Sequence, residues 1–216
     1  MMTNEKKEQF CFFAASLFDP PDNALADYLK HDALQSLVRE YVSRWGSDMQ
    51  VLPVFSKGRD GKNTLSALKK EYTRLFDQWE GERISLVEST YKPWTVDKDC
   101  KMVFAASKGL IMGDWAVHMQ EIYRQLSLEV PEEFRSMPDH LVLELEFLAM
   151  LYRFASNEQI ERFIEDHLDW VPKLKGEMEK VDPHPFYQNA VELIYLFLQN
   201  EVNERKVEGH GQKKIH

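Results

Sequence analysis

Cysteine is scarce in this chain. Only Cys11 and Cys100 occur, and they form no C-x-x-C pair, which gives no sign of a disulfide framework and suits a reducing compartment. Long apolar runs are also missing. No stretch approaches the roughly 18 residues of a membrane span, so we expect no stable membrane insertion. The apolar segment 10–18 follows mixed charges and precedes Pro20 and Pro21, which indicates a first helix rather than a signal peptide.

Catalytic signatures are absent as well. Gly61 and Lys62 have Ser56 where the first glycine of a phosphate-binding loop would stand, and no G-x-G-x-x-G or G-x-S-x-G motif occurs. The seven histidines form no H-E-x-x-H pair, and a single helical histidine is more often a packing or surface residue than a metal ligand. We therefore expect no catalytic residue, and no stoichiometric metal, haem or flavin, because no ligand cluster is evident.

The charge balance narrows the class of partner. The net charge is −9 over 216 residues, which disfavours nucleic acid and favours a basic partner. A hydrophobic content of 44% is enough to bury a core in a chain of this length. We expect one all-helical domain over residues 1–202, followed by a disordered charged tail over 203–216.

Apolar residues recur at helical spacing along most of the chain, which predicts an all-α bundle of about nine to eleven helices. Expected capping residues are Asp22, Asp32, Asp114 and Asn157, and Pro172 is expected to end the helix that Asn157 begins. The predicted helices lie within 10–18, 22–29, 32–45, 65–79, 98–107, 114–126, 138–154, 157–170 and 184–198, with a loop at 47–62 and an ordered loop at 82–97.

The stretch 136–170 is the segment around which the chain is organised. Pro138 suits the first turn of a helix, and Ser136 with Asp139 resembles a capping box. Beyond these residues, apolar side chains occupy nearly every angle of the helical wheel. We therefore expect this helix to be buried among other helices.

Two polar stripes flank an apolar strip on this helix. At about 100° per residue, Asp139, Glu146 and Arg153 fall on one stripe, and His140 and Glu144 fall on the other. The apolar strip between them consists of Leu143, Phe147, Met150 and Phe154. Carboxylates beside an apolar strip suit a cationic, hydrophobic peptide. The alternative is that both stripes are helix edges that reach water, with Glu146 paired to Arg153.

Six motifs occur in a characteristic order. The run 138–148 reads P-D-H-L-V-L-E-L-E-F-L. The others are Glu71-Tyr72-x-x-Leu75-Phe76, Glu88-Ser89-Thr90-Tyr91, Met112-Gly113-Asp114 followed by Tyr123-Arg124, Phe163 with His167-Leu168 and Trp170, and His184-Pro185-Phe186-Tyr187. Over about residues 65–200 the chain thereby resembles the TorD/DmsD/NarJ family of cytoplasmic molybdoenzyme chaperones. It departs at Ser127, where glycine is common, at Trp170, which comes one position early, and before Glu88, where the usual prolines are missing.

The resemblance implies an all-α chaperone without enzymatic activity. Such a chaperone binds the twin-arginine signal peptide of a molybdopterin-dependent oxidoreductase subunit and assists cofactor insertion before export. The resemblance assigns peptide binding to Ser89, Tyr91, Gly113, Asp139 and His140, and the helical wheel adds Leu143 and Phe147 as apolar lining. Relatives are also associated with weak binding of guanine nucleotide or molybdopterin cofactor, and with monomers and swapped dimers. The client enzyme and the oligomeric state stay open.

Two other functions compete with this interpretation. A helical adaptor without a signal-peptide role would show the same apolar periodicity. A small hydrolase could use His140 and Glu144, four residues apart on one helix, as an acid–base pair. No nucleophile or oxyanion site accompanies that pair in the sequence, which makes the hydrolase the weaker alternative.

Overall fold

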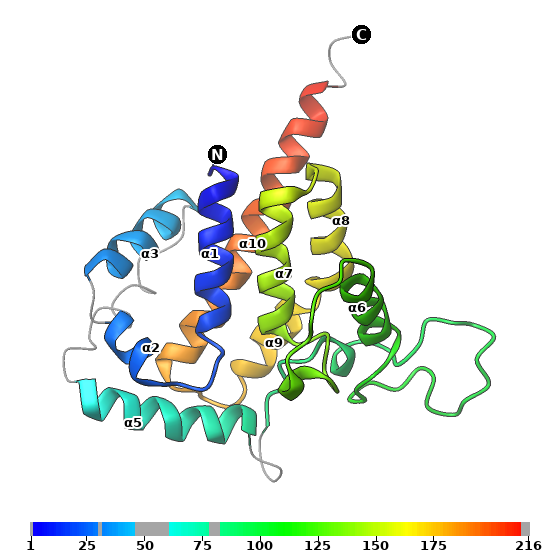
Figure 1. The fold of residues 1–216 in the computed structure, drawn as a ribbon, viewed down its shortest axis with the longest axis horizontal. Helices are drawn as coiled ribbons and strands as arrows, with labels where there is room; N and C mark the ends of the chain where they lie inside the picture. The colour runs from blue at the N-terminus through cyan, green and yellow to red at the C-terminus, as the bar shows by residue number, and fades with distance from the viewer. Residues whose placement is uncertain (1, 30–31, 46–60, 78–82, 213–216) are drawn as a thin grey trace.

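The computed structural model of the chain describes residues 2–29, 32–45, 61–77 and 83–212 (Figure 1). The loop expected at 47–62 lies outside these residues except for its last two, which already belong to a helix. Within the described ranges the backbone forms helices, turns and irregular segments, with one isolated antiparallel bridge between Val87 and His140 and no strand. The predicted all-α fold is confirmed.

Nine α-helices lie within the described residues, in agreement with the predicted nine to eleven. They are α1 (Asn4–Ser16), α2 (Asn23–Tyr28), α3 (Asp32–Arg44), α5 (Gly61–Tyr72), α6 (Asp114–Gln125), α7 (Leu141–Phe154), α8 (Asn157–His167), α9 (Val171–Met178) and α10 (Pro185–Gln212). A π-helical turn, η2 (Thr73–Asp77), extends α5, and two short 3-10 turns, η3 (Glu88–Thr90) and η4 (Glu132–Phe134), lie between the longer helices.

Side-chain caps fix where several helices begin. Asp22 accepts a hydrogen bond from the backbone N–H of Leu25, as predicted. Helix α8 is capped by Ser156 in a reciprocal capping box with Gln159, so the predicted cap Asn157 is wrong by one residue. A hydroxyl that accepts from an otherwise unpaired N–H typically stabilises a helix by about 1 kcal/mol.

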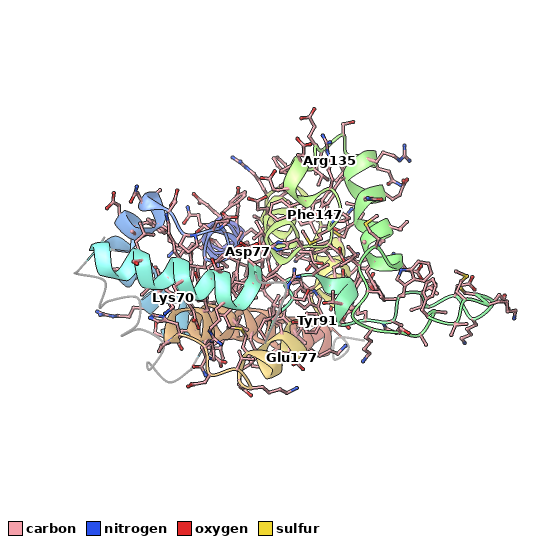
Figure 2. The ribbon with its side chains drawn as sticks, turned by 90° about the horizontal axis from the view of Figure 1, so that it is seen from below. Lys70, Asp77, Tyr91, Arg135, Phe147 and Glu177 are labelled. Atoms are coloured by element: carbon pink, nitrogen blue, oxygen red, sulfur yellow. The ribbon has the colours of Figure 1, made fainter. Side chains whose placement is uncertain are left out.

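Three further predictions are corrected. Residues 98–107 form turns, not a helix, in a loop that projects from the bundle (Figures 1 and 2). Its apolar side chains, including the fully exposed Val103, find no core, and a short segment without tertiary packing rarely stays helical. Pro172 lies in the first turn of α9 and does not terminate α8. Helix α10 continues to Gln212, well past both Leu198 and the predicted start of a disordered tail at Asn203.

The core lies where α1, α7 and α10 run side by side (Figure 1). The ring of Phe10 on α1 is within 5.0 Å of Tyr41 and 5.2 Å of Trp45, measured between centroids, and 4.6 Å from Phe197 on α10. One continuous hydrophobic cluster joins buried residues from Met2 to Leu198. The described elements therefore share a single core, as a single-domain bundle requires.

Among the described residues, no helix has the length and apolar character needed to cross a membrane.

Candidate functional site

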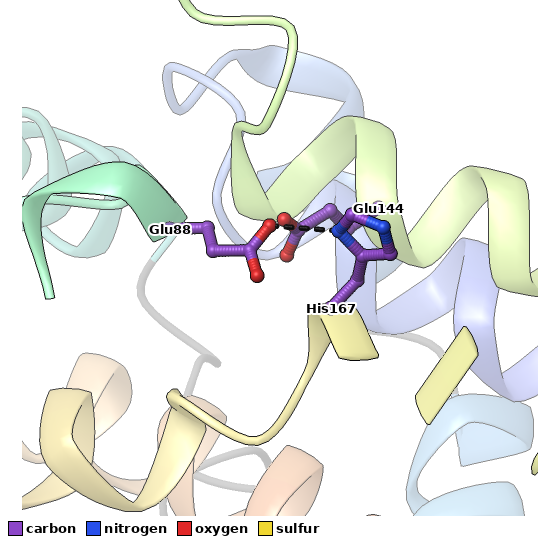
Figure 3. Close-up of side chains that lie close together, drawn as sticks. All are labelled: Glu88, Glu144 and His167. Atoms are coloured by element: carbon purple, nitrogen blue, oxygen red, sulfur yellow. Dashed lines mark hydrogen bonds and ion pairs between the residues drawn. The ribbon is translucent and has the colours of Figure 1, made fainter. Parts of the chain in front are cut away.

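Three titratable side chains from distant parts of the chain meet in the interior (Figure 3). Glu88 comes from η3, Glu144 from α7 and His167 from the end of α8. Their exposed fractions are 0%, 0% and 1%. The Nδ1 atom of His167 lies 2.9 Å from Oε2 of Glu88, so the imidazole N–H donates to the carboxylate. This bond ties the loop before α6 to the end of α8.

The bond to Glu88 sets the tautomer of His167. With its proton on Nδ1, neutral His167 leaves Nε2 as an acceptor. Nδ1 of His118 lies 2.8 Å from that atom and donates to it. Partial burial, followed by the neighbouring imidazole of His167, lowers the pKa of His118. The chain Glu88–His167–His118 therefore runs from the interior to an exposed residue on α6.

A buried lysine balances the charge of this cluster. Lys92, which is 4% exposed, places Nζ 2.5 Å from Oε1 of Glu88 and 2.5 Å from Oδ1 of Asp169. The same ammonium donates to the carbonyl of Asp166 at 2.6 Å and stands 3.9 Å from the centroid of the Trp115 ring. A buried cation with this many partners is compensated, and removing it would leave the Glu88 carboxylate buried without a cationic partner.

Glu144 has a different role from Glu88. Its Oε2 accepts from the indole N–H of Trp170 at 3.1 Å, and the same N–H also donates to the carbonyl of His167 at 2.9 Å. Burial, reinforced by the neighbouring Glu88 carboxylate, raises the pKa of Glu144 well above its usual range. This shift favours the protonated form of Glu144, which weakens the repulsion between two adjacent carboxylates.

The sequence shows no ligand cluster, whereas the structure brings one together. Ligand atoms of Glu88, Glu144 and His167 all lie within 4.8 Å of one another, and imidazole with carboxylates is a donor set suited to zinc. The ammonium of Lys92 already neutralises Glu88 at hydrogen-bond distance, so a divalent cation there would meet an adjacent positive charge. The cluster is best explained as a polar junction that holds the loop, α7 and α8 together.

Two predicted peptide-binding residues bond each other in the interior. Oδ2 of Asp139 accepts from the Ser89 backbone N–H at 2.7 Å and from its hydroxyl, and both residues are 0% exposed. The predicted capping box of Ser136 and Asp139 is wrong, because α7 begins three residues past Pro138 and His140 is its N-cap. The Asp139 carboxylate is used across the fold rather than within its own helix.

His140 also makes structural contacts within the fold. Its Nδ1 accepts from the Val142 N–H at 3.3 Å, its ring lies 4.8 Å from that of Phe134, and burial lowers its pKa to about 4. Glu144 accepts its hydrogen bond from Trp170 rather than from His140. The acid–base pair that a hydrolase would need is therefore not assembled.

Tyr91 and Gly113 lie at the two ends of the loop between η3 and α6 and hold it in place. Tyr91 stacks on Trp170 with centroids 4.9 Å apart and donates to the carbonyl of Ser85 at 2.8 Å. Gly113 precedes α6, and a β-carbon there would collide with the carbonyl oxygen of Trp94, to which the N–H of Asp114 donates at 2.8 Å. Asp114 was predicted to cap α6. It is instead the first residue of α6, and its carboxylate holds the loop through Thr95 and Val96.

Leu143 and Phe147, the remaining two predicted residues, line cavities. A groove of about 550 Å³ lies between α6, α7 and α8. Its apolar walls come from Ile122, Leu126, Leu128, Phe147, Met150, Leu151, Phe154, Ala155 and Phe163. A smaller cavity of about 120 Å³ shares Leu128, Phe147 and Met150 with the groove and adds Leu143 together with Glu129 and Glu146. We call these two cavities together the apolar groove.

Part of the expected apolar strip on α7 is thus open to solvent. Phe154, at the end of the strip, is 78% exposed. Glu146, earlier on the same helix, is exposed as well. Arg153 pairs with Glu8 on α1 at 3.5 Å, so the alternative pairing of Glu146 with Arg153 is wrong. The carboxylate of Glu146 stays at the edge of the groove.

Sequence reasoning missed most of the opposite wall. His118 and Ile122 on α6, with Leu126 and Leu128 just after it, complete the groove, and Lys92 completes the polar junction. The helical periodicity of α6 was the only local sign of the first three. Nothing in the sequence near Lys92 distinguishes it from a surface lysine.

Comparisons with known proteins found a matching family model and several relatives. The family model described as nitrate reductase delta subunit matches residues 32–175. A chaperone protein TorD from Shewanella piezotolerans is 29% identical over 157 residues, covering 72% of this chain and 70% of the relative. A chaperone protein TorD from Vibrio cholerae serotype O1 is 26% identical over 217 residues, covering 92% and 91%.

These relatives are named as chaperones. The hydrolase alternative is not supported, because His140 and Glu144 are bonded to other partners, Val142 and Trp170. With the family model matching well over half of its length, this chain belongs to the nitrate reductase delta subunit family, as the resemblance to TorD/DmsD/NarJ chaperones predicts.

Proposed function

We propose that the chain is a cytoplasmic chaperone that binds the twin-arginine signal peptide of a molybdopterin-dependent oxidoreductase subunit and assists its cofactor insertion before export. The observation that supports this most is the apolar groove, which is open on one side and carries exposed carboxylates at one end. A twin-arginine peptide has the complementary order, two adjacent positive charges followed by an apolar segment.

The groove suits the apolar segment of such a peptide. Its walls are helical ridges of Leu, Ile, Met and Phe side chains from α6, α7 and α8, and an amphipathic or apolar helix binds a groove of this kind through residues spaced three and four apart. Phe154 and Leu126, exposed by 78% and 54%, would be covered in the complex. Covering them removes apolar area from water, which favours binding.

The arginine pair is assigned to the acidic end of the groove. Glu129 and Glu146 line the smaller cavity beside Phe147 and are exposed. Carboxylates accept paired hydrogen bonds from a guanidinium in a fork geometry, and the net charge of −9 attracts the peptide at long range. Ser89 and Asp139 act behind this surface in our proposal, by holding the loop against the start of α7 rather than by touching the peptide.

Calorimetric titration tests the proposal. The probes are synthetic twin-arginine signal peptides of molybdoenzymes that reduce dimethyl sulfoxide, trimethylamine oxide, tetrathionate or nitrate. At least one should bind wild type, with affinity that falls as salt is added. Phe154→Asp should weaken binding by about tenfold or more, because it places a charge in the apolar wall. Val117→Asp is the matched control, because Val117 is an exposed apolar residue of α6 that lies outside the groove.

The acidic end is tested with conservative variants. Glu146→Gln and Glu129→Gln should each weaken binding by several-fold and flatten its salt dependence, because each removes one screened ion pair. Asp139→Asn should leave the affinity of the folded protein unchanged, since Asp139 is fully buried. The opposite pattern, with binding weakened by Asp139→Asn and unaffected by Glu146→Gln, would move the arginine site to the segment around Asp139. Failure of every peptide to bind would favour a helical adaptor.

A further inference from the structure

Two histidines meet on the wall of the apolar groove. Nδ1 of His118 on α6 lies 2.8 Å from Nε2 of His167 at the end of α8, and both residues line the larger cavity. His118 is exposed, whereas His167 is 1% exposed. The pair of imidazole nitrogens can therefore be reached from solvent through His118.

The hydrogen bond to Glu88 orients His167 as a metal ligand. Because Nδ1–H of His167 donates to Oε2 of Glu88 at 2.9 Å, the lone pair on Nε2 is directed toward His118. Metal-ligating histidines in proteins typically donate their other N–H to a carboxylate, which fixes the tautomer and the ring orientation. His167 shows this arrangement, and the buried ion pair of Glu88 with Lys92 holds the carboxylate in place.

The surroundings of the pair orient the buried imidazole. Asp166 lines the same cavity, but its carboxylate is paired with Arg162 at 3.4 Å, so it supplies negative charge near the pair rather than a free ligand. Phe163 stacks on His167 with centroids 5.1 Å apart, and Trp115 meets His167 edge-on at 6.1 Å. These rings restrict the motion of the buried imidazole and exclude water from one side.

We propose that His118 and His167 form a binding site for a divalent transition metal ion of the zinc class. His118 Nδ1 and His167 Nε2 are the protein ligands, and water completes the coordination. At Zn–N lengths of about 2.0–2.1 Å, two tetrahedral nitrogen ligands stand about 3.3 Å apart. The ion therefore replaces the present hydrogen bond after an outward shift of roughly half an ångström, which the exposed His118 side chain can make. The His118 proton moves from Nδ1 to Nε2 of the same ring, which frees the Nδ1 lone pair for the ion.

This site is separate from the grouping of Glu88, Glu144 and His167. That grouping would use Nδ1 of His167, which faces Glu88 and the Lys92 ammonium, whereas the proposed site uses Nε2 on the groove side. It does not depend on the proposed peptide binding, and its test contains no peptide. Imidazole ligands favour zinc, copper and nickel over magnesium and calcium.

Calorimetric titration of the full chain with Zn²⁺, and absorption spectroscopy with Co²⁺, test the site. Wild type should bind one ion at this site, and His118→Ala should weaken that binding by more than about tenfold, since even an outer-shell change typically costs this much. His184→Asn is the matched control, because His184 lies at the start of α10, where Nδ1 accepts from the Phe186 N–H, and asparagine keeps an acceptor.

The outcomes separate clearly. His118 is exposed, so His118→Ala should fold normally, and melting temperatures without metal verify this. Loss of the ion in His118→Ala with retention in His184→Asn supports the site. Absence of Zn²⁺ binding to wild type overturns the proposal. Equal binding by His118→Ala and His184→Asn overturns it too, because the ion would then be held elsewhere, for example by His210 or His216 near the C-terminus.

Discussion

The aromatic core around Phe10 and the polar junction around Glu88 are equally buried but are stabilised differently. In the core, aromatic rings from α1, α3 and α10 meet at centroid distances of 4.6–5.2 Å. In the junction, Glu88 is held by Lys92 and His167 through directed bonds. The stabilising free energy of apolar packing is roughly proportional to the buried area, and such packing tolerates some changes in side-chain shape. A buried polar group instead depends on each partner, because an unpaired charge in the interior is costly.

The largest effect is expected in the aromatic core. Phe10→Ala should lower the free energy of unfolding by about 4 kcal/mol, because it removes a fully buried ring and leaves a cavity between α1 and α10. Phe10→Leu keeps most of the volume and should cost clearly less. Urea denaturation measures both. A loss below about 1 kcal/mol for Phe10→Ala would show that the neighbouring helices collapse into the space.

A smaller loss is expected from breaking the polar junction. Lys92→Met should cost about 3 kcal/mol, because it leaves the Glu88 carboxylate buried without its cation. Adding Glu88→Gln to this variant should restore part of the loss, since a neutral amide can still accept from His167. No such recovery would mean that the packing of the Lys92 stem, rather than its charge, stabilises the junction. Arg124→Met is the surface control, because its partner Glu121 is exposed to solvent, and it should leave the melting temperature nearly unchanged.

The smallest effect is a change in the pH dependence of stability. The pKa of Glu144 is raised in the folded protein, chiefly by burial. A raised acid pKa stabilises the fold fully below the unfolded-state pKa of about 4.3, and this contribution is lost as pH rises toward the folded-state pKa. Glu144→Gln keeps an acceptor for Trp170 and cannot ionise. Its melting temperature relative to wild type should therefore increase between pH 5 and pH 8. A constant difference across that range would indicate that Glu144 does not titrate differently on folding.

The two regions also differ in how far the sequence predicts them. The core residues Phe10, Tyr41 and Trp45 stand on apolar faces with near-ideal helical spacing, so their helices follow from periodicity alone. The helices end less predictably. Ser156 and His140 are N-caps where Asn157 and Ser136 were expected, because neighbouring polar residues compete for one capping position and tertiary contacts choose between them.

The residues of the candidate site also differ in how far the sequence predicts them. The helical wheel places Leu143 and Phe147 on one strip of α7, and both line cavities in the structure. The wheel also places Asp139 on the stripe of Glu146, but their environments are opposite. Asp139 is fully buried against Ser89, whereas Glu146 is exposed. A wheel records angle around one helix and carries no information about what packs on it.

The sequence by itself determined the all-α class, the apolar strip on α7 and the resemblance to chaperones, because these depend on local spacing and on motifs in linear order. Only the tertiary structure decided that Glu88, Glu144 and His167 meet, that Lys92 neutralises Glu88, and that His118 reaches His167 across the groove. Those contacts join residues up to 79 positions apart. They form because burying a charged or polar side chain is costly unless folding brings its partner to hydrogen-bond distance, a condition that residue spacing does not record.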